Sequence, residues 1–513
     1  MKSETRNRHL SFTIGAGVLV GVLVFLFHQQ FARNDFFFDD AADYIRASDS
    51  PFLSTWLNTN SASPIELLRL RQDQQFRARP WDYLYMAKDN AALRHFHGPA
   101  SFYALHVVRS FSKSAQPVRL LISFVASLTC AVMVIALATF SVPLPLAMLL
   151  ALYVGVQGWY IEISFDPSPH TWYILSAFTF LFFIVRYLLT NKNRDLYLAA
   201  VAFAAAFATM EFSVELIAGV PLAVILIAFF AEHRFPAWPA LQKPLIKAAA
   251  LFFFVTFLLW PGGWLRGGYF ETYGAMGLEA GVMNRGTARY PLMNVIYQRL
   301  LGGQAMFLVA GSLCVAGVLI LLFRRRLSIA TIVFSSYSLI AFGIGLTDHF
   351  ALSTYKAEFK VFLFATVGLI TVDVSRAFFH RTFSRRAFFS ILALTVAIGC
   401  ITGARHTKSL IVFRPWLGSI FDGVRQNVPA GETLLVTDRW QPLWLYLPEY
   451  RFEPTETKWS AEPRIKSRAA QIRYGLFDGA VPPPPGSLPL ATYSTFPGHT
   501  TVLWKTVEGH APR

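Results

Sequence analysis

The chain has 513 residues, of which 54% are hydrophobic and only 15% are charged, and its mean hydropathy is +0.43. Soluble domains carry about a quarter charged residues, so this composition excludes an ordinary soluble protein and indicates a chain that lies mostly in lipid. The net charge of +16 would suit a nucleic-acid partner, but the basic residues lie largely in short loops between apolar runs. That distribution reports membrane orientation, and we expect no nucleic acid to bind.

Apolar runs long enough to cross a membrane recur along most of the chain. The first is preceded by Lys2, Arg6 and Arg8, but it is long for a signal peptide and no small-residue cleavage site follows it, so it predicts an uncleaved span. The fifth and sixth runs are short and are separated at "TMEFSVE". Eleven spans are predicted: residues 10–28, 118–140, 143–161, 169–189, 195–210, 212–231, 245–261, 299–322, 328–346, 354–373 and 387–404.

The distribution of Lys and Arg between the spans predicts which side of the membrane each end of the chain occupies. With eleven spans, most of the basic residues in the short loops fall on the side of the N-terminus. The positive-inside rule then places the N-terminus in the cytoplasm and the C-terminus outside. Both long hydrophilic segments therefore lie outside the cell membrane.

These two external segments differ in character. Residues 29–117 form a long first loop, in which "DDAADYIRA" and "PIELLRLRQ" repeat apolar residues at helical spacing and predict helices in the headgroup plane. The tail, 405–513, combines the helical pattern "SIFDGVRQNV" with strand patterns "GETLLVTD" and "TTVLWKTV". The expected fold class is an all-α polytopic membrane domain, 1–404, followed by a small external α/β domain.

Three carboxylates stand where the first external loop opens, in "RNDFFFDDAADYIRASD". Asp39, Asp40 and Asp43 follow a run of phenylalanines, so they lie close to the lipid boundary, at the start of a predicted helix whose N-terminal dipole favours ionised carboxylate. The plain interpretation is a solvated loop or a set of helix N-caps. The chemical interpretation is a general base, since adjacent carboxylates diverge and one can point at a reacting hydroxyl.

Other polar side chains flank the predicted spans on the same side. His97 and Tyr103, in "HFHGPASFYALH", could orient a sugar, although an aromatic anchor at headgroup level explains them equally well. Glu162 and Asp166, in "YIEISFDPSPHTW", could bind an acceptor, or they could cap a helical hairpin.

Basic residues recur beside glycines and aromatic residues in the later external loops. They are Arg266, Arg289, Lys356 and Lys360, and the last two lie one helical turn apart at the mouth of a span. Snorkelling to the interface explains such lysines, but a phosphate group at that depth requires the same cations. We therefore name these four residues as candidates for binding a donor phosphate.

The arrangement resembles the GT-C integral-membrane glycosyltransferases, most closely the bacterial relatives of the protein O-mannosyltransferases and of the lipid A aminoarabinose transferases. Asp39, Asp40 and Tyr44 match the family's acidic pair and following tyrosine, and His97, Pro99 and Tyr103 match its His-Pro-Pro run with aromatics. Gly98 replaces the first of those prolines. The resemblance covers residues 1 to about 404 in topology and these two short motifs in sequence.

This resemblance implies an inverting glycosyltransferase in a bacterial inner membrane, with a periplasmic C-terminus. The donor would be a polyprenyl-phosphate-linked sugar whose lipid tail lies in the bilayer, and the acceptor a hydroxyl of a glycan, lipid or protein. Asp39, or failing that Asp40, would be the catalytic base. Some members use a divalent cation, so Mg²⁺ or Mn²⁺ at Asp166 stays open, although no tight cluster of oxygen ligands favours a metal.

Two other classes of function fit the composition. A transporter or flippase of lipid-linked glycans would need polar groups along a central path, whereas the charged candidates gather on one side of the membrane. A non-catalytic scaffold that presents the tail domain would leave the acidic pair and the long first loop without a role. The sequence therefore favours the transferase.

Overall fold

The computed structural model describes most of the membrane domain and the sheet of the tail. The described residues are 2–32, 40–58, 97–210, 212–230, 238–269, 273, 316–317, 319, 327–347, 355–379, 381–410, 416–436, 441–454, 472–478, 486–496 and 499–506. Within them the chain is mostly helical, with one five-stranded sheet near the C-terminus. This confirms the predicted fold class.

Seven helices in the described part of the chain are long and apolar enough to cross a membrane, which makes this a multi-pass membrane protein. They are α1 (Lys2–Gln29), α8 (Ala115–Thr139), α11 (His170–Thr190), α13 (Ser213–Phe230), α14 (Trp238–Leu259), α20 (Tyr355–Phe378) and α21 (Thr382–Leu410). Three further helices of the described residues belong to the bundle: α9 (Leu144–Gly155), α12 (Asn193–Phe207) and α19 (Ile329–Thr347). Each coincides with a predicted span, and the predicted span 299–322 lies mostly outside the described residues.

Small residues bring the first helices of the bundle together. Gly17 and Gly21 lie four residues apart on α1, and a Cβ atom at Gly17 would stand 2.9 Å from the Ala131 carbonyl oxygen of α8. Close approach through such a Gly-xxx-Gly pair is how helices gain contact where lipid removes the hydrophobic driving force. By contrast, α14 and α21 are largely exposed and present aliphatic and aromatic side chains outward, as lipid-facing helices do.

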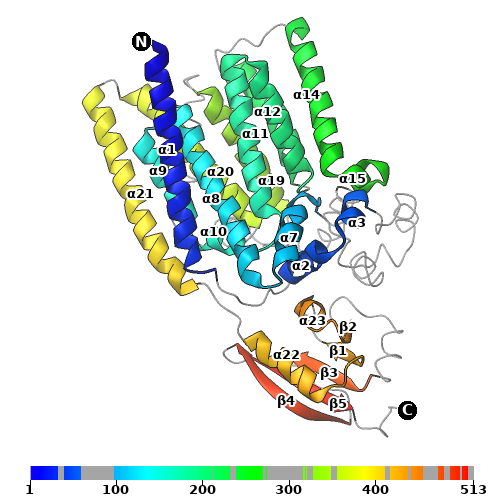
Figure 1. The fold of residues 1–513 in the computed structure, drawn as a ribbon. Coiled ribbons are helices and arrows are strands. Elements are labelled where there is room, and N and C mark those ends of the chain that lie inside the picture. Colours follow the sequence, from blue (N-terminus) through cyan, green and yellow to red (C-terminus); the bar gives the residue numbers. More distant parts are fainter. Residues whose placement is uncertain are drawn as a thin grey trace.

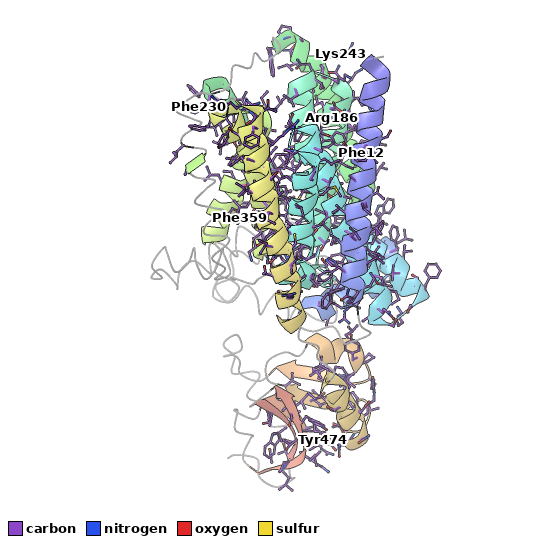
Figure 2. All side chains as sticks on the ribbon, turned by 90° about the vertical axis from the view of Figure 1, so that its left-hand side faces the viewer. Phe12, Arg186, Phe230, Lys243, Phe359 and Tyr474 are labelled. Atoms are coloured by element: carbon purple, nitrogen blue, oxygen red, sulfur yellow. The ribbon has the colours of Figure 1, made fainter. Side chains whose placement is uncertain are left out.

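Short helices gather at the end of the bundle that is opposite the start of α1 (Figure 1). They are α2 (Asp40–Asp49), α3 (Phe52–Leu57), α7 (Ala100–Phe111), α10 (Gly158–Ile163) and α15 (Pro261–Leu265). The tail domain lies beyond the same end (Figure 1). Arg186 and Lys243 lie toward the other end, together with the start of α1 (Figure 2), as the positive-inside pattern requires.

Aromatic side chains cap the C-terminus of α14 at this end. The last carbonyl groups of a helix have no partner within it, and here Trp56 Nε1 donates to Leu258 (2.9 Å), while the Tyr103 hydroxyl donates to Leu259 (2.7 Å). Burial, with a smaller contribution from neighbouring Tyr269, raises the pKa of Tyr103 well above its ordinary value, so its hydroxyl stays a donor. Helices α3 and α7 are thereby fixed to the bundle.

In its described residues the tail folds as a mixed sheet with helices packed against it. Its strands are β1 (Thr433–Val436), β2 (Arg451–Pro454), β3 (Tyr474–Asp478), β4 (Ser487–Phe496) and β5 (His499–Thr506), in the order β2-β1-β3-β5-β4. Strand β1 runs parallel to β2 and β3, whereas β5 is antiparallel to both of its neighbours. The patterns read as a helix and two strands are α22 (Trp416–Asn427), β1 and β5. Helix α21 continues to Leu410, past the expected boundary at 404.

Candidate active site

The two motif segments meet at the end of the bundle that carries the short helices. The Tyr44 hydroxyl lies 3.0 Å from His97 Nε2, although 53 residues separate them, and both side chains are buried. Tyr44 lies one helical turn after Asp40, the first residue of α2. The pair therefore joins the start of α2, where the acidic pair lies, to the segment that leads into α7.

Close backbone contact places His97. Gly98 lies against the C-terminal end of α12, where a Cβ atom would overlap the carbonyl oxygen of Ala208. That carbonyl also accepts a hydrogen bond from the Ala100 amide (3.1 Å). Proline at position 98, which the resemblance leads one to expect, would place its ring atoms into this backbone, which explains the glycine.

An apolar cluster and an ion pair hold α2 against α7. Ala42, Tyr44 and Ile45 pack with side chains of α7 and α8, and the Tyr44 ring stacks on Phe102 with 5.9 Å between centroids. At the other end of α2, Asp49 accepts hydrogen bonds from Arg109 Nε (3.0 Å) and Nη2 (2.6 Å) and from Lys113 Nζ (2.8 Å). Burial alone would raise the pKa of the Asp49 carboxyl, but these two cations outweigh it and hold the pKa below its ordinary value.

Substituting alanine for Asp49 is expected to loosen α2, because the side chain of Arg109 is only 7% exposed and its guanidinium would lose its carboxylate. A hydrogen bond to a charged group contributes about 1.5–3 kcal/mol, so amide-exchange protection of α2 and α7 should fall roughly 10- to 100-fold. Lys113→Met is the matched control, since the side chain of Lys113 is 70% exposed. It should cost less than about 1 kcal/mol. Equal amide-exchange protection in Asp49→Ala and wild type would mean that the ion pairs of Asp49 do not hold α2 in place.

The same ion pair fixes a pH dependence. A carboxyl group whose pKa is lowered by folding stabilises the folded state fully above its unfolded pKa of about 4, and this contribution is lost as the pH falls through the lowered folded value. After correction for intrinsic exchange rates, protection of α2 should therefore be constant between about pH 8 and pH 5 and should decrease below about pH 4. If protection of α2 began to decrease near pH 6, a histidine would be responsible instead.

Behind His97, aromatic and acidic side chains continue into the bundle. The His97 ring lies 6.4 Å from the ring of His170, at the start of α11, and His170 contacts Phe212 at 6.1 Å. Glu215 is buried in the first turn of α13, and its Oε2 accepts a hydrogen bond from the Tyr337 hydroxyl (2.7 Å). The Tyr173 hydroxyl lies 3.4 Å from the same oxygen.

Glu215 was not among the residues that the sequence analysis selected. An ionisable residue inside a membrane domain is costly and is usually functional, and its signal was the acid in "TMEFSVE", between two apolar runs. His170 was also missed, because only the fold brings it beside His97. His170 and Glu215 are therefore further candidates for residues that line the active site.

The predicted phosphate-binding cations lie in different environments. Lys360 is 3% exposed, and its ammonium lies 5.1 Å from the centre of the Trp159 ring in α10, so it faces the protein rather than the interface. Arg266, at the end of α15, is exposed. Lys356 lies in the first turn of α20, but its side chain falls outside the described part, as does all of Arg289.

The structure describes the side chains of only some of the predicted acidic residues. Asp39 lies outside the described residues, and of Asp40 the structure describes the backbone alone. Glu162 is exposed on α10, and Asp166 Oδ1 accepts a hydrogen bond from the Ser168 amide (3.1 Å) in the turn before α11. Among the described residues no group of three or more His, Cys, Asp or Glu side chains is arranged to hold a metal ion.

Comparison with solved structures identifies the fold. No protein-family model matches the sequence, and no curated protein matches it either. ArnT from Cupriavidus metallidurans bound to undecaprenyl phosphate matches with a TM-score of 0.56 and 13% identity, over 97% of this chain and 98% of ArnT. The apo form of that ArnT matches with a TM-score of 0.56 and 12% identity, over 95% and 97% of the two chains.

A second enzyme has the same fold. The archaeal oligosaccharyltransferase AglB from Archaeoglobus fulgidus, in complex with an inhibitory peptide and a dolichol-phosphate, matches with a TM-score of 0.54 and 13% identity. The match covers 90% of this chain and 69% of AglB. At sequence identities this low, the matches show a shared fold. The protein therefore shares the fold of ArnT and AglB, the GT-C fold that its two motifs predict.

Proposed function

We propose that this protein is an inverting glycosyltransferase that moves a sugar from a polyprenyl-phosphate donor to an acceptor hydroxyl on the periplasmic face of a bacterial inner membrane. The observation that carries the proposal is the buried contact of Tyr44 with His97, one helical turn after Asp40, in a chain with the GT-C fold. One ArnT structure contains undecaprenyl phosphate and the AglB structure contains a dolichol-phosphate, which supports a lipid-linked donor.

In the proposed reaction, an acceptor hydroxyl attacks the anomeric carbon from the side opposite the phosphate. The new glycosidic bond forms as the bond from carbon to phosphate oxygen breaks, and the lipid phosphate leaves with the electron pair. Asp39, or failing that Asp40, takes the hydroxyl proton. Cations near the membrane boundary stabilise the charge that develops on the leaving phosphate.

Lys360 is the best-placed cation for that task among the described residues. It lies on α20, one turn deeper than Lys356, and a buried ammonium is costly unless an anion or an aromatic face compensates it. The Trp159 ring supplies part of that compensation in the resting protein. A donor phosphate would also pair with this ammonium, while its lipid tail stays in the bilayer.

Removing the charge of Lys360 is expected to weaken donor binding. Lys360→Met keeps an unbranched side chain but loses a charge-assisted hydrogen bond worth about 1.5–3 kcal/mol, so the Kd for undecaprenyl phosphate should rise roughly 10- to 100-fold. Titration of the protein in nanodiscs, followed by tryptophan fluorescence, measures this. The matched control is Lys247→Met in α14, an exposed lysine of another helix. Equal affinity of Lys360→Met and wild type would remove Lys360 from the phosphate site.

Mass spectrometry of co-purifying lipids tests the function itself. The protein is purified in detergent, its lipids are identified, and the measurement is repeated after addition of undecaprenyl-phosphate-linked sugars. A bound or consumed donor supports the transferase and names the sugar. Bulk phospholipid alone, with no added donor bound or consumed, would favour a transporter or a scaffold.

A further inference from the structure

The tail domain contacts the membrane domain at the helix that begins with Asp40. Helix α23 (Gln441–Tyr446), which lies between β1 and β2, packs against α2. Its Leu445 adds to the cluster formed by Ala42, Tyr44 and Ile45 of α2 with side chains of α7 and α8. Figure 1 shows α23 facing the short helices across the space between the two domains.

Helix α23 is itself held firmly within the tail. Leu443 and Leu447 are buried in the tail core, and Tyr446 stacks on Phe421 of α22 with 5.1 Å between ring centroids. Arg425 of α22 donates hydrogen bonds to the Tyr446 carbonyl (2.7 Å) and to Glu449 (2.8 Å). Leu445 does not belong to that core. The side chain that contacts the membrane domain therefore extends from a helix that is fixed within the tail.

A helix of ten residues such as α2 gains little stability alone, and its position depends on the surfaces that it contacts. Arg109 and Lys113 hold its C-terminal end at Asp49, whereas Ala42, Tyr44 and Ile45 pack in the apolar cluster with side chains of α7 and α8. Leu445 packs against the same cluster. Contact with the tail therefore acts on the cluster that includes Tyr44, one helical turn after Asp40.

From this arrangement we infer that the tail domain positions the catalytic end of α2, with Leu445 as the positioning residue. The inference rests on the proposed function, in which the base lies at the start of α2. A reacting group displaced by about 1 Å can lose about 100-fold in rate. Undocking the tail should therefore slow the chemical step more than it weakens binding of the donor.

The test compares Leu445→Ala with wild type in the full chain. Deuterium exchange is measured on α2, on the tail sheet and on α8, and kinetics are measured with a mixture of undecaprenyl-phosphate-linked pentoses and hexoses. Protection of α2 should fall about tenfold while the tail sheet and α8 keep theirs. The kcat should fall about tenfold, with the KM for the donor within about twofold.

Two further variants separate docking from general damage. Leu445→Met keeps the side-chain volume and should restore both readouts, whereas Leu488→Ala, on an exposed leucine of β4, should change neither. Unchanged α2 protection or unchanged kcat in Leu445→Ala overturns the inference. If wild type transfers no sugar, the proposed function fails, and the docking of α2 is then decided by exchange alone: lost protection supports it and unchanged protection overturns it.

Discussion

Replacing Asp39 with asparagine is expected to lower the rate of sugar transfer by about 10²- to 10⁴-fold, the usual contribution of a general base. Asparagine has nearly the shape of aspartate, so the fold should persist, but its amide cannot take a proton from the acceptor hydroxyl. The loss should fall on kcat, because the donor phosphate is bound by other residues. Steady-state kinetics with saturating donor measures the loss of kcat, and circular dichroism checks that the fold persists.

Asp40→Asn is the informative comparison, because the two acids are adjacent and the sequence predicts that their side chains diverge. We expect Asp40→Asn to retain more activity than Asp39→Asn, and Asp422→Asn, on the exposed face of α22, to behave as wild type. If Asp39→Asn turned over at the wild-type rate while Asp40→Asn did not, the role of base would pass to Asp40. Full activity in both variants would remove the acidic pair from the mechanism.

The membrane helices could be predicted from the sequence because lipid imposes a simple rule. A span must satisfy its backbone hydrogen bonds within itself, so it appears as a long apolar run. The break at "TMEFSVE" was predicted and is present, since α12 ends at Phe207 and α13 begins at Ser213. Boundaries were less accurate, because α1, α14 and α21 continue as helices beyond the apolar windows.

The side-chain contacts of the site could be predicted only in part. The motifs indicated that Tyr44 and His97 matter, but their hydrogen bond depends on how α2 and α7 pack. Contact of His170 with His97, and of Glu215 with Tyr337, depends on helices far apart in sequence, so no local pattern contains it. Tyr103 was selected as a sugar-binding residue, and its hydroxyl caps α14 through Leu259 in this structure.

Gly98→Ala is expected to lower transfer about 100-fold, the loss that accompanies a displacement of about 1 Å at a reacting centre. An added Cβ atom would overlap the Ala208 carbonyl oxygen, which is backbone and already accepts a hydrogen bond from Ala100, so it cannot rotate away. Position 98 must move instead, and His97 moves with it, which breaks the contact with Tyr44. Overpacking of this kind costs about 1–3 kcal/mol. The measurement is donor turnover at matched amounts of folded protein.

Gly15→Ala provides the control, because no atom from another helix in the described part of the chain lies within 4 Å of the position that its Cβ would occupy on α1. It should leave turnover unchanged and should slightly favour the helix. Wild-type turnover in Gly98→Ala would mean that the backbone contact with α12 does not set the position of His97. A loss in Gly98→Ala alone would show that close contact with α12 is the reason for a glycine at position 98. A side chain there displaces His97 from Tyr44, while both candidate catalytic acids stay unchanged.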